Sequence, residues 1–355
     1  MTQTLWPDIP TSAFMDFSTK PSNDLNIPLA QLPAGTRLEQ EFLVRERADK
    51  VTRAGAPFVI LTLANRSGSI DTAPIWSERL DWAAGVERGT VVTVLGEIAI
   101  FGDAGNKRRQ LDVRAPLRIV PPDRFAVADF LPRVDVSTAQ LWKSLDALRE
   151  SIKSTLVRSA VDLFFADSAF RKAFEKTPGA VNGHHAQLGG LLMHVVEVTD
   201  IARHIARTVR KANEDLVIAG ALLHDIGKVE AYAVSPEGFS NTSSGTLLGH
   251  VTLGALMFDR KLHASDIALS NAQRDELLHF ILSHHGALEF GSPVQPMTTE
   301  AEIVHWADEA SAKATDFIDE YKDADLYPPG AGNEVSAKRS WRLGRKIWRR
   351  PGGWE

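Results

Sequence analysis

The feature that most constrains the fold of this 355-residue chain is a change in hydrophobic periodicity near residue 121. Between residues 37 and 121, short apolar runs alternate with turn-forming segments, a pattern typical of β-strands. From Ser137 onward, apolar side chains recur at helical spacing. Pro121-Pro122 and Pro132 interrupt both patterns. We therefore predict a multidomain protein in which an all-β domain precedes an all-α domain.

The resulting domain boundaries follow the composition of the chain. The lead-in is rich in Pro, Ser, Thr and Asp and has no sustained periodicity. The tail is basic and contains tryptophan. We predict an irregular lead-in over 1–36, a β-barrel over 37–121, a linker over 122–136, a helical domain over 137–325 and a basic tail over 326–355.

The β region is short and turn-rich. Its predicted strands cover residues 38–45, 58–64, 70–76, 90–101 and 109–120. Five short strands separated by glycine-containing turns favour a small barrel. An OB-fold is the natural candidate, and barrels of this type bind single-stranded nucleic acid.

Basic and aromatic residues of the barrel are candidates for contact with such a strand. Arg45, Arg53 and Arg66 could follow a phosphate backbone, since arginine pairs well with phosphate. The candidates for stacking on bases are Phe58, Trp76 and Phe101. The alternative is that the aromatic rings belong to the core and the arginines form a solvated face.

The helical region has a clear pattern of apolar segments. The predicted helices cover residues 188–209, 214–224, 248–262, 273–283 and 299–321. The chain has no cysteine, which excludes disulfides, thiolate zinc sites and cysteine nucleophiles. Any metal must therefore be bound by histidine, carboxylate, carbonyl or water ligands.

Charge and hydropathy narrow the possible partners. The N-terminus lacks a basic stretch followed by an apolar run, and no apolar segment reaches the roughly 20 residues of a membrane span. We expect a cytoplasmic protein with no membrane partner. The net charge is -5, yet residues 326–355 carry seven Lys or Arg against two Glu. This tail is suited either to nucleic acid or to docking on the protein's own acidic surface.

Histidine is distributed unevenly. All 11 histidines lie between His184 and His305, and the first 183 residues contain none. The adjacent pair His224-Asp225 follows the apolar run Ala221-Leu222-Leu223. An imidazole and a carboxylate are both good ligands for a divalent metal ion. The clustering therefore indicates a metal site in this segment.

Separate helical elements offer further ligands. The candidates are His194, His224, Asp225, His250, His284, His285 and Asp308. Taken singly, a histidine on an apolar helix is more often a packed core residue. Taken together, these residues resemble the HD-domain superfamily of metal-dependent phosphohydrolases. The motifs that carry the resemblance are Gly189 to His194, Leu222 to Lys228, Gly249-His250, Ser283 to Gly286 and Ala307-Asp308.

The ligand set is large for one ion. Seven nitrogen and oxygen ligands suit two octahedral ions that share a carboxylate. In addition to noting the resemblance, we assign His194, His224 and Asp308 to the first ion. Asp225 is shared between the first ion and the second. The second ion would take His250, His284 and His285. Two such ions can clamp a phosphate and activate water for in-line attack.

Other residues of the helical domain are candidates for contact with substrate. Lys228 lies about one helical turn past His224 and could neutralise phosphate oxygens or the leaving group. We assign it and Asp225 to the catalytic centre. His184 and His185 lie a few residues before the first motif and could also contact the substrate phosphate.

The order of the two domains resembles the YhaM family of 3′→5′ exoribonucleases. The similar stretches are residues 54–70 with Ile75-Trp76, His184 to His194 and His224 to Tyr232, within a resemblance that covers about residues 38–322. It implies hydrolysis of single-stranded RNA, and of single-stranded DNA, to nucleoside monophosphates. It also implies two divalent ions. Mn²⁺ is the metal we expect, and Fe²⁺, Mg²⁺, Co²⁺, Ni²⁺ or Zn²⁺ are alternatives. We further expect a homo-oligomer.

Two other functions fit the same motifs. One is a phosphohydrolase of a small nucleotide or cyclic dinucleotide, in which the barrel serves regulation or assembly. The other is a non-catalytic protein that binds single strands and holds its metals for structural reasons. Shortening of a labelled strand from its 3′ end separates these functions from the exonuclease.

Overall fold

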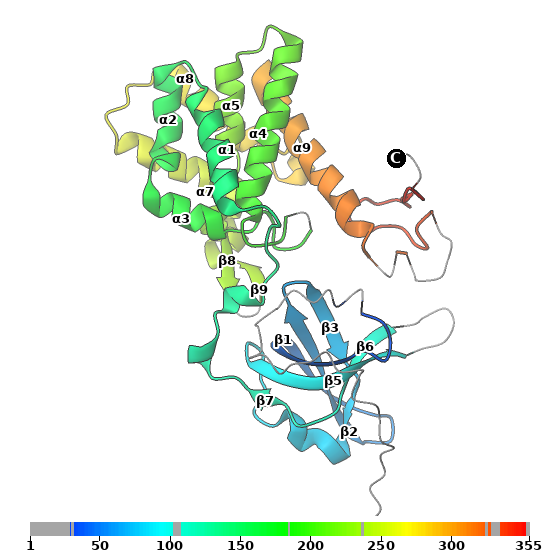
Figure 1. Ribbon diagram of the computed structural model, residues 1–355. Coiled ribbons are helices and arrows are strands. Elements are labelled where there is room, and N and C mark those ends of the chain that lie inside the picture. The colour runs from blue at the N-terminus through cyan, green and yellow to red at the C-terminus, as the bar shows by residue number, and fades with distance from the viewer. Residues whose placement is uncertain are drawn as a thin grey trace, which may run out of the picture. The chain divides into compact units, whose positions relative to one another are not determined.

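The computed structural model describes residues 29, 32–101, 108–183, 185–235, 238–323, 326–327 and 334–352. The chain divides into two compact units between Leu131 and Pro132, within the segment expected to be a linker. Figure 1 shows a β unit and a helical unit, each described here by itself. Most of the predicted lead-in lies outside the described residues.

The first unit is a β-barrel of five main strands and two short ones. The strands are β1 (Arg37–Val51), β2 (Pro57–Asn65), β3 (Gly68–Thr72), β4 (Ile75–Trp76), β5 (Val91–Phe101), β6 (Arg108–Val113) and β7 (Arg118–Ile119). Strand β1 pairs with both β2 and β5, β2 pairs with β3, and β6 pairs with both β5 and β3. The sheet is therefore closed into a barrel. Only the β3–β6 pairing is parallel among the barrel strands. The structure confirms the predicted OB-like barrel.

Strand β1 is longer than its hydrophobic pattern predicts. Residues 37–43 pair with β5, and the segment from Leu43 to Val51 pairs with β2. The register is irregular between Val44 and Glu46, which allows the strand to turn from one partner to the other. The second half of β1 is rich in charge because one face lies on solvent, so it lacks the alternation of a buried strand.

Proline divides two of the predicted strands. The segment 70–76 forms β3 and β4 on either side of Pro74, and the segment 109–120 forms β6 and β7 on either side of Pro116. Proline has no N–H to donate to a ladder, which explains both interruptions. Inside the barrel, Phe42, Leu61 and Leu111 are fully buried and pack in one hydrophobic core.

The second unit is built from helices around a continuous apolar core. Its helices are α1 (Thr138–Glu150), α2 (Thr155–Phe165), α3 (Ser168–Lys176), α4 (Gly190–Val209), α5 (Glu214–Leu223), α6 (Lys228–Ala231), α7 (Ser243–His263), α8 (Asn271–Ser283) and α9 (Thr299–Glu320). Helix α4 contacts α5 and α9, and α5 also contacts α8 (Figure 1). These four helices carry or directly precede most of the predicted metal ligands.

The unit differs from a purely helical domain in one element. Strands β8 (Tyr232–Ser235) and β9 (Gly238–Asn241) form an antiparallel hairpin between α6 and α7. Each strand is only four residues long, and such a short pattern is not distinguishable from a loop by periodicity. Within the described ranges, no helix combines the length and hydrophobicity that a membrane span requires.

Candidate metal centre

A buried turn between α5 and α6 carries the pair His224-Asp225. The last residues of α5 are fully buried, and both His224 and Asp225 have at most 1% exposed surface. Gly227 follows at a point of close backbone approach, because a Cβ there would lie 2.0 Å from the carbonyl oxygen of His250. Glycine therefore allows α7 to pack against this turn and to bring His250 close to Asp225.

Helix α7 is itself adapted to place His250. The helix is interrupted at Gly249, which has a φ of 72°. This left-handed conformation is readily adopted by glycine and rarely by other residues. The interruption changes the direction of the chain one residue before His250. The Nε2 atom of that residue lies 3.4 Å from Oδ1 of Asp225.

The two carboxylate oxygens of Asp225 face different sets of histidines. Oδ2 lies 3.1 Å from Nε2 of His224 and 3.4 Å from Nε2 of His194. Oδ1 lies 3.4 Å from Nε2 of His250 and 3.6 Å from Nε2 of His284. One carboxylate therefore stands between two groups of potential ligands, with one oxygen directed to each.

Each group is compact enough to hold a metal ion. The ligand atoms of His194, His224 and Asp225 all lie within 4.8 Å of one another, and so do those of His250, His284 and His285. Asp308, on α9, joins the first group, since its Oδ1 lies 3.1 Å from Nε2 of His194 and 4.0 Å from Nε2 of His224. The structure thus brings all seven predicted ligands together from separate elements.

Backbone carbonyls set the orientation of three of the imidazoles. Nδ1 of His224 lies 2.7 Å from the oxygen of Ala221, and Nδ1 of His284 lies 2.8 Å from that of Ile281. In the same way, Nδ1 of His285 lies 2.6 Å from the oxygen of Phe290. A carbonyl can only accept a hydrogen bond, so these nitrogens carry the proton. The Nε2 lone pairs are then directed at the centre, as a metal ligand requires.

Two of these nitrogens support the fit of a cation. Nε2 of His250 and Nε2 of His284 are buried and have no hydrogen-bond partner among the described residues. A buried polar atom without a partner costs about 1–3 kcal/mol. A divalent ion bound to these nitrogens would remove that cost, and the donor set of imidazoles and carboxylates suits a first-row divalent metal.

Electrostatics divide the histidines into two kinds. Burial lowers the pKa of His250 to about 3, and burial also holds the pKa of His284 well below its ordinary value. Both are therefore neutral near pH 7, the state in which imidazole binds metal. Burial also lowers the pKa of His194, but its hydrogen bonds with Asp225 and Asp308 outweigh this effect and raise the pKa to about 9.

Lys228 supplies positive charge at the same place. Its Nζ lies 2.5 Å from Oδ2 of Asp225, and the lysine is buried. Burial opposes ionisation of both groups, but their mutual attraction raises the pKa of Lys228 and, with His224, holds the pKa of Asp225 well below its usual value. The pair is therefore ionised. The ammonium group lies beside the metal ligands, where it can also reach a bound phosphate.

The ring of His185 lies 5.3 Å, centroid to centroid, from that of His194. The side chain of His185 is buried, and its Nε2 lies 3.1 Å from Oε2 of Glu197. The same Glu197 oxygen accepts a hydrogen bond from Ser311, whose hydroxyl lies 3.3 Å from Nδ1 of His194. The contact with Glu197 gives His185 a partner within the protein, and its contact with substrate phosphate stays a prediction. His184 lies outside the described residues.

Sequence reasoning missed Glu197 and Ser311. Glu197 follows His194 by three residues on α4, so the two side chains lie on neighbouring positions of one helix face. That spacing was a usable signal for Glu197. Ser311 lies three residues after Asp308 on α9 and is 117 residues from His194, so only the packing of α4 against α9 reveals its role.

The predicted arginines of the barrel are differently placed. Arg66 donates from Nε to the carbonyl oxygen of Asp129 at 3.0 Å, and its Nη2 lies 3.1 Å from Oδ1 of the same residue. It therefore holds the chain that leaves the barrel, and its predicted contact with phosphate stays a prediction. Arg45 is half-buried, and burial lowers its pKa. Arg53 is exposed in the turn after β1.

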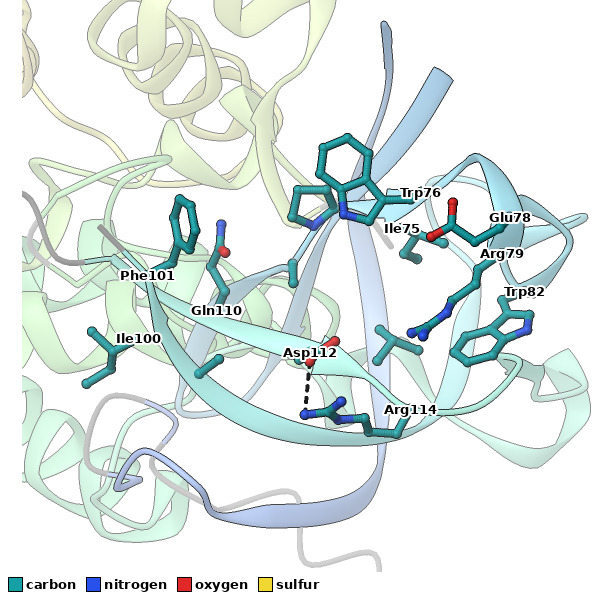
Figure 2. Close-up of a pocket in the computed structure, with 14 residues that line it drawn as sticks. Ile75, Trp76, Glu78, Arg79, Trp82, Ile100, Phe101, Gln110, Asp112 and Arg114 are labelled. Atoms are coloured by element: carbon teal, nitrogen blue, oxygen red, sulfur yellow. Dashed lines mark ion pairs between the residues drawn. The ribbon is translucent and has the colours of Figure 1, made fainter. Parts of the chain in front are cut away.

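A groove on the barrel collects a different set of side chains. Its volume is about 460 Å³, and Trp76, Trp82 and Phe101 contribute aromatic surface to its lining. Figure 2 shows Phe101 and Gln110 toward one end, Arg79 and Trp82 toward the other, and Trp76 between them. Phe58 lies behind this surface, with its ring centroid 5.1 Å from that of Trp76. Trp76 and Phe101 were predicted to stack on bases, whereas Trp82 and Arg79 were missed.

Charge in the groove is mixed. Arg114 pairs with Asp112 at 3.1 Å, the contact drawn in Figure 2. The guanidinium of Arg79 lies over the ring of Trp82, with its central carbon 4.8 Å from the ring centroid. Arg45, Arg53 and Arg66 do not line the groove. The groove thus offers three aromatic surfaces, and its two arginines are accompanied by two acidic residues, Glu78 and Asp112.

Comparison with known proteins agrees with this architecture. The family model for the HD domain matches residues 191–313. The 3′-5′ exoribonuclease YhaM of Bacillus subtilis is 29% identical over 279 residues, which cover 79% of this chain and 86% of that protein. The YhaM proteins of Bacillus velezensis and of a Geobacillus species are 29% and 28% identical, over 79% of this chain and 86% and 83% of their own lengths. No solved structure matches.

Residues 191–313 therefore match the HD domain, which is a domain of metal-dependent phosphohydrolases, and an OB-like barrel precedes them in the chain. An HD domain implies binding of divalent metal, in agreement with the two ligand groups around Asp225. Within this class, the chain resembles the YhaM family of 3′-5′ exoribonucleases.

Proposed function

We propose that this protein is a metal-dependent 3′→5′ exonuclease that degrades single-stranded RNA, and also single-stranded DNA, to nucleoside monophosphates. The observation that carries the proposal is the union, in one chain, of the centre around Asp225 with a barrel that has an aromatic groove. The names of the YhaM relatives support the choice of RNA and of the 3′ end.

The proposed centre uses the seven ligands in two groups. His194, His224 and Asp308 would hold one divalent ion, His250, His284 and His285 would hold another, and Asp225 presents one oxygen to each group of ligands. We propose a first-row divalent metal, with Mn²⁺ as the first candidate, since selection among these ions at mixed imidazole and carboxylate sites depends on metal availability as well as on the ligands. Bound ions of this kind supply positive charge for the phosphoryl transition state and activate the attacking water.

The protein's own groups complete the centre. Lys228 brings a buried ammonium group to the edge of the ligand cluster and can neutralise a phosphate oxygen or the leaving oxygen. The carbonyls of Ala221 and Ile281 fix the rings of His224 and His284. Ser311 does the same for His194. Such partners hold the ligands in place while substrate and product exchange.

Burial of the centre favours attack at a chain end. His224, Asp225 and His284 have at most 1% exposed surface, so a reacting phosphate must enter the protein to reach them. A strand terminus can enter such a site singly, whereas the middle of a strand must bend sharply with both flanks outside. This supports an exonuclease over an endonuclease.

The barrel groove is the proposed capture surface for the strand. Bases stack on aromatic rings with little dependence on their identity, at about 1–3 kcal/mol per base. Trp76 and Phe101 are exposed by 42% and 73% and can offer their faces in this way. Arg79 lies beside these rings and can contact phosphates, whereas Arg114 is paired with Asp112.

The test is incubation of the protein with 5′-labelled single-stranded RNA and Mn²⁺. The proposal predicts a ladder of strands shortened from the 3′ end, with nucleoside monophosphates as the small products. Internal fragments would indicate an endonuclease. An intact strand together with rapid hydrolysis of a mononucleotide or cyclic dinucleotide would support the small-molecule phosphohydrolase instead.

A further inference from the structure

The basic C-terminal segment is an ordered arm. Within residues 334–352, here called the C-terminal arm, Val335 and Trp348 form an antiparallel bridge. Ser336 and Ile347 exchange two hydrogen bonds, from the Ser336 amide to the Ile347 oxygen at 2.8 Å and from the Ile347 amide to the Ser336 hydroxyl at 3.0 Å. The two ends of the arm are thus tied together.

An apolar contact anchors the arm to the end of α9. Ile347 is 3% exposed and lies in a small core with Leu326 and Tyr327, and Phe317 packs against it. The hydroxyl of Tyr327 donates to the carbonyl oxygen of Ile347 at 3.1 Å. This small core is separate from the main hydrophobic core, so the arm packs on the domain without contributing to its main core.

Three of the arginines serve this anchoring. Nη1 of Arg342 lies 3.4 Å from Oδ1 of Asp316. Arg349 lies over the ring of Tyr327 at 4.3 Å, and Arg345 lies 5.6 Å from the centroid of Phe317. Docking onto the protein's own surface therefore accounts for part of the basic charge that the tail carries.

Docking leaves an aromatic and basic surface exposed. Trp341 is 76% exposed and Trp348 is 48% exposed. Lys346 and Arg350 are exposed and make no ion pair with any residue that the structure describes. Residues 334–352 include seven Lys or Arg and one Glu, a net charge of +6. Exposed indole rings among cations suit single-stranded nucleic acid, in which bases and phosphates alternate.

The arm contacts α9, the helix that also carries the metal ligand Asp308. Asp316, which pairs with Arg342, follows Asp308 by eight residues on α9, or roughly 12 Å at 1.5 Å per residue. Oδ1 of Asp316 also lies 3.9 Å from the position that a Cβ would take at Gly183. That glycine belongs to the loop that carries His185, which contacts Glu197 of α4. The distance between the arm and the metal centre can therefore be spanned by a few nucleotides of a bound strand.

We propose that the C-terminal arm is a second strand-binding surface, on which Trp341 stacks against a base upstream of the 3′ end. This inference rests on the proposed exonuclease function and deepens it. The arm would hold long substrates near the centre between cleavage steps. Strands too short to reach the arm gain nothing from it, so the contribution of the arm depends on substrate length.

The test compares Trp341→Ala with wild type on RNA of twelve and of three nucleotides, and on a chromogenic phosphodiester. The variant is expected to raise KM for the longer RNA by about 5- to 150-fold, the value of one lost base stack. It should leave the chromogenic diester and the short RNA unaffected. Trp341→Phe keeps a stacking ring and should stay close to wild type. Ile318→Ala, an exposed apolar residue of α9, is the matched control and should leave KM unchanged.

Each outcome decides the proposal. An unchanged KM for the longer RNA in Trp341→Ala overturns it. An unchanged KM together with dissociation of an oligomer, seen by sedimentation, assigns the arm to contact between copies and also overturns it. If the wild-type protein does not shorten RNA, the proposed function fails. The arm is then judged by binding of a fluorescent twelve-nucleotide strand, where loss of affinity in Trp341→Ala supports it and equal affinity refutes it.

Discussion

Nε2 of His250 lies 3.4 Å from Oδ1 of Asp225, on the opposite side of the carboxylate from His224. This relationship makes Asp225 common to both groups of potential ligands. Neutralising a single residue is therefore expected to affect two metal positions. The predictions below begin from this arrangement.

The metal content of Asp225→Asn tests the shared carboxylate. The amide keeps the shape of the side chain but removes its negative charge, so affinity should fall at both positions. His250→Ala, in contrast, should lose metal from one group only, because His194 and His224 face the other oxygen. Both variants are dialysed against trace Mn²⁺ and analysed by elemental mass spectrometry. Full metal content in Asp225→Asn would contradict the shared role.

Lys228→Met should destabilise the metal-free protein far more than the metal-loaded protein. Removing one partner from a buried ion pair leaves an uncompensated charge and costs about 3–5 kcal/mol. A bound cation would compensate Asp225 in its place. Unfolding by denaturant with chelator and with Mn²⁺ measures the difference.

Lys261→Met provides the matched control for that experiment. Its Nζ lies 2.6 Å from Oδ2 of Asp167, but both side chains are about one third exposed. An exposed pair contributes about 0–1 kcal/mol, and this one is remote from the metal ligands. The control should show a small loss that does not depend on metal. An equal metal dependence in both variants would argue against charge compensation at Lys228.

The stability of the metal-free protein should fall as pH rises from about 6.5 to about 9. The pKa of His194 is raised from 6.5 to about 9 by Asp225 and Asp308, against the opposing effect of burial. A raised pKa gives stability that is complete below the unfolded value and is lost as pH passes the folded value. The pKa of His250 is lowered, so the ionisation of His250 affects stability only below pH 6.5, outside this window.

Calorimetry offers a second measure of the protonation state of His194. His194 is protonated at pH 7 in the metal-free protein, whereas a metal ligand must be neutral. Metal binding should therefore release a proton from His194. Titrations with Mn²⁺ in buffers of different ionisation enthalpy report the number released. Proton release that does not change between pH 7 and pH 10 would contradict the assignment.

Trp76→Ala should weaken binding of single-stranded RNA by about 5- to 150-fold, the equivalent of 1–3 kcal/mol for one base stack. The ring lines the groove and is 42% exposed. Arg66→Ala is the control, because Arg66 is engaged with Asp129 and does not line the groove. Fluorescence anisotropy measures affinity, and thermal unfolding confirms that both variants fold. A larger loss in Arg66→Ala would reverse the assignment.

Much of the architecture could be predicted because local pattern and tertiary structure agree. The change of periodicity between Val120 and Ser137 gave the fold classes, and the helices of the HD domain begin within a few residues of their predicted starts. The ligands were visible because histidine is rare and clustered in this chain. Motif context at His224-Asp225 then linked them to one centre.

What could not be predicted depends on residues distant in sequence. Arg66 looked like a phosphate contact until the structure placed Asp129, 63 residues away, against it. The contact of His185 with Glu197, whose oxygen lies 3.1 Å from its Nε2, likewise depends on the fold and was not predicted. The groove escaped notice because β4, the segment Ser77–Ala83, β5 and β6 each contribute only a few side chains. Pairings of this kind arise from packing and leave no local pattern.

The central claim is that the centre around Asp225 shortens single strands from the 3′ end. The most direct test is the rate at which wild type and Asp225→Asn, each supplied with the same concentration of Mn²⁺, shorten 5′-labelled RNA in a single turnover. The account predicts a 3′-shortened ladder with wild type, nucleoside monophosphates as the small product, and only background cleavage with Asp225→Asn. A ladder that forms at the wild-type rate in Asp225→Asn would contradict it.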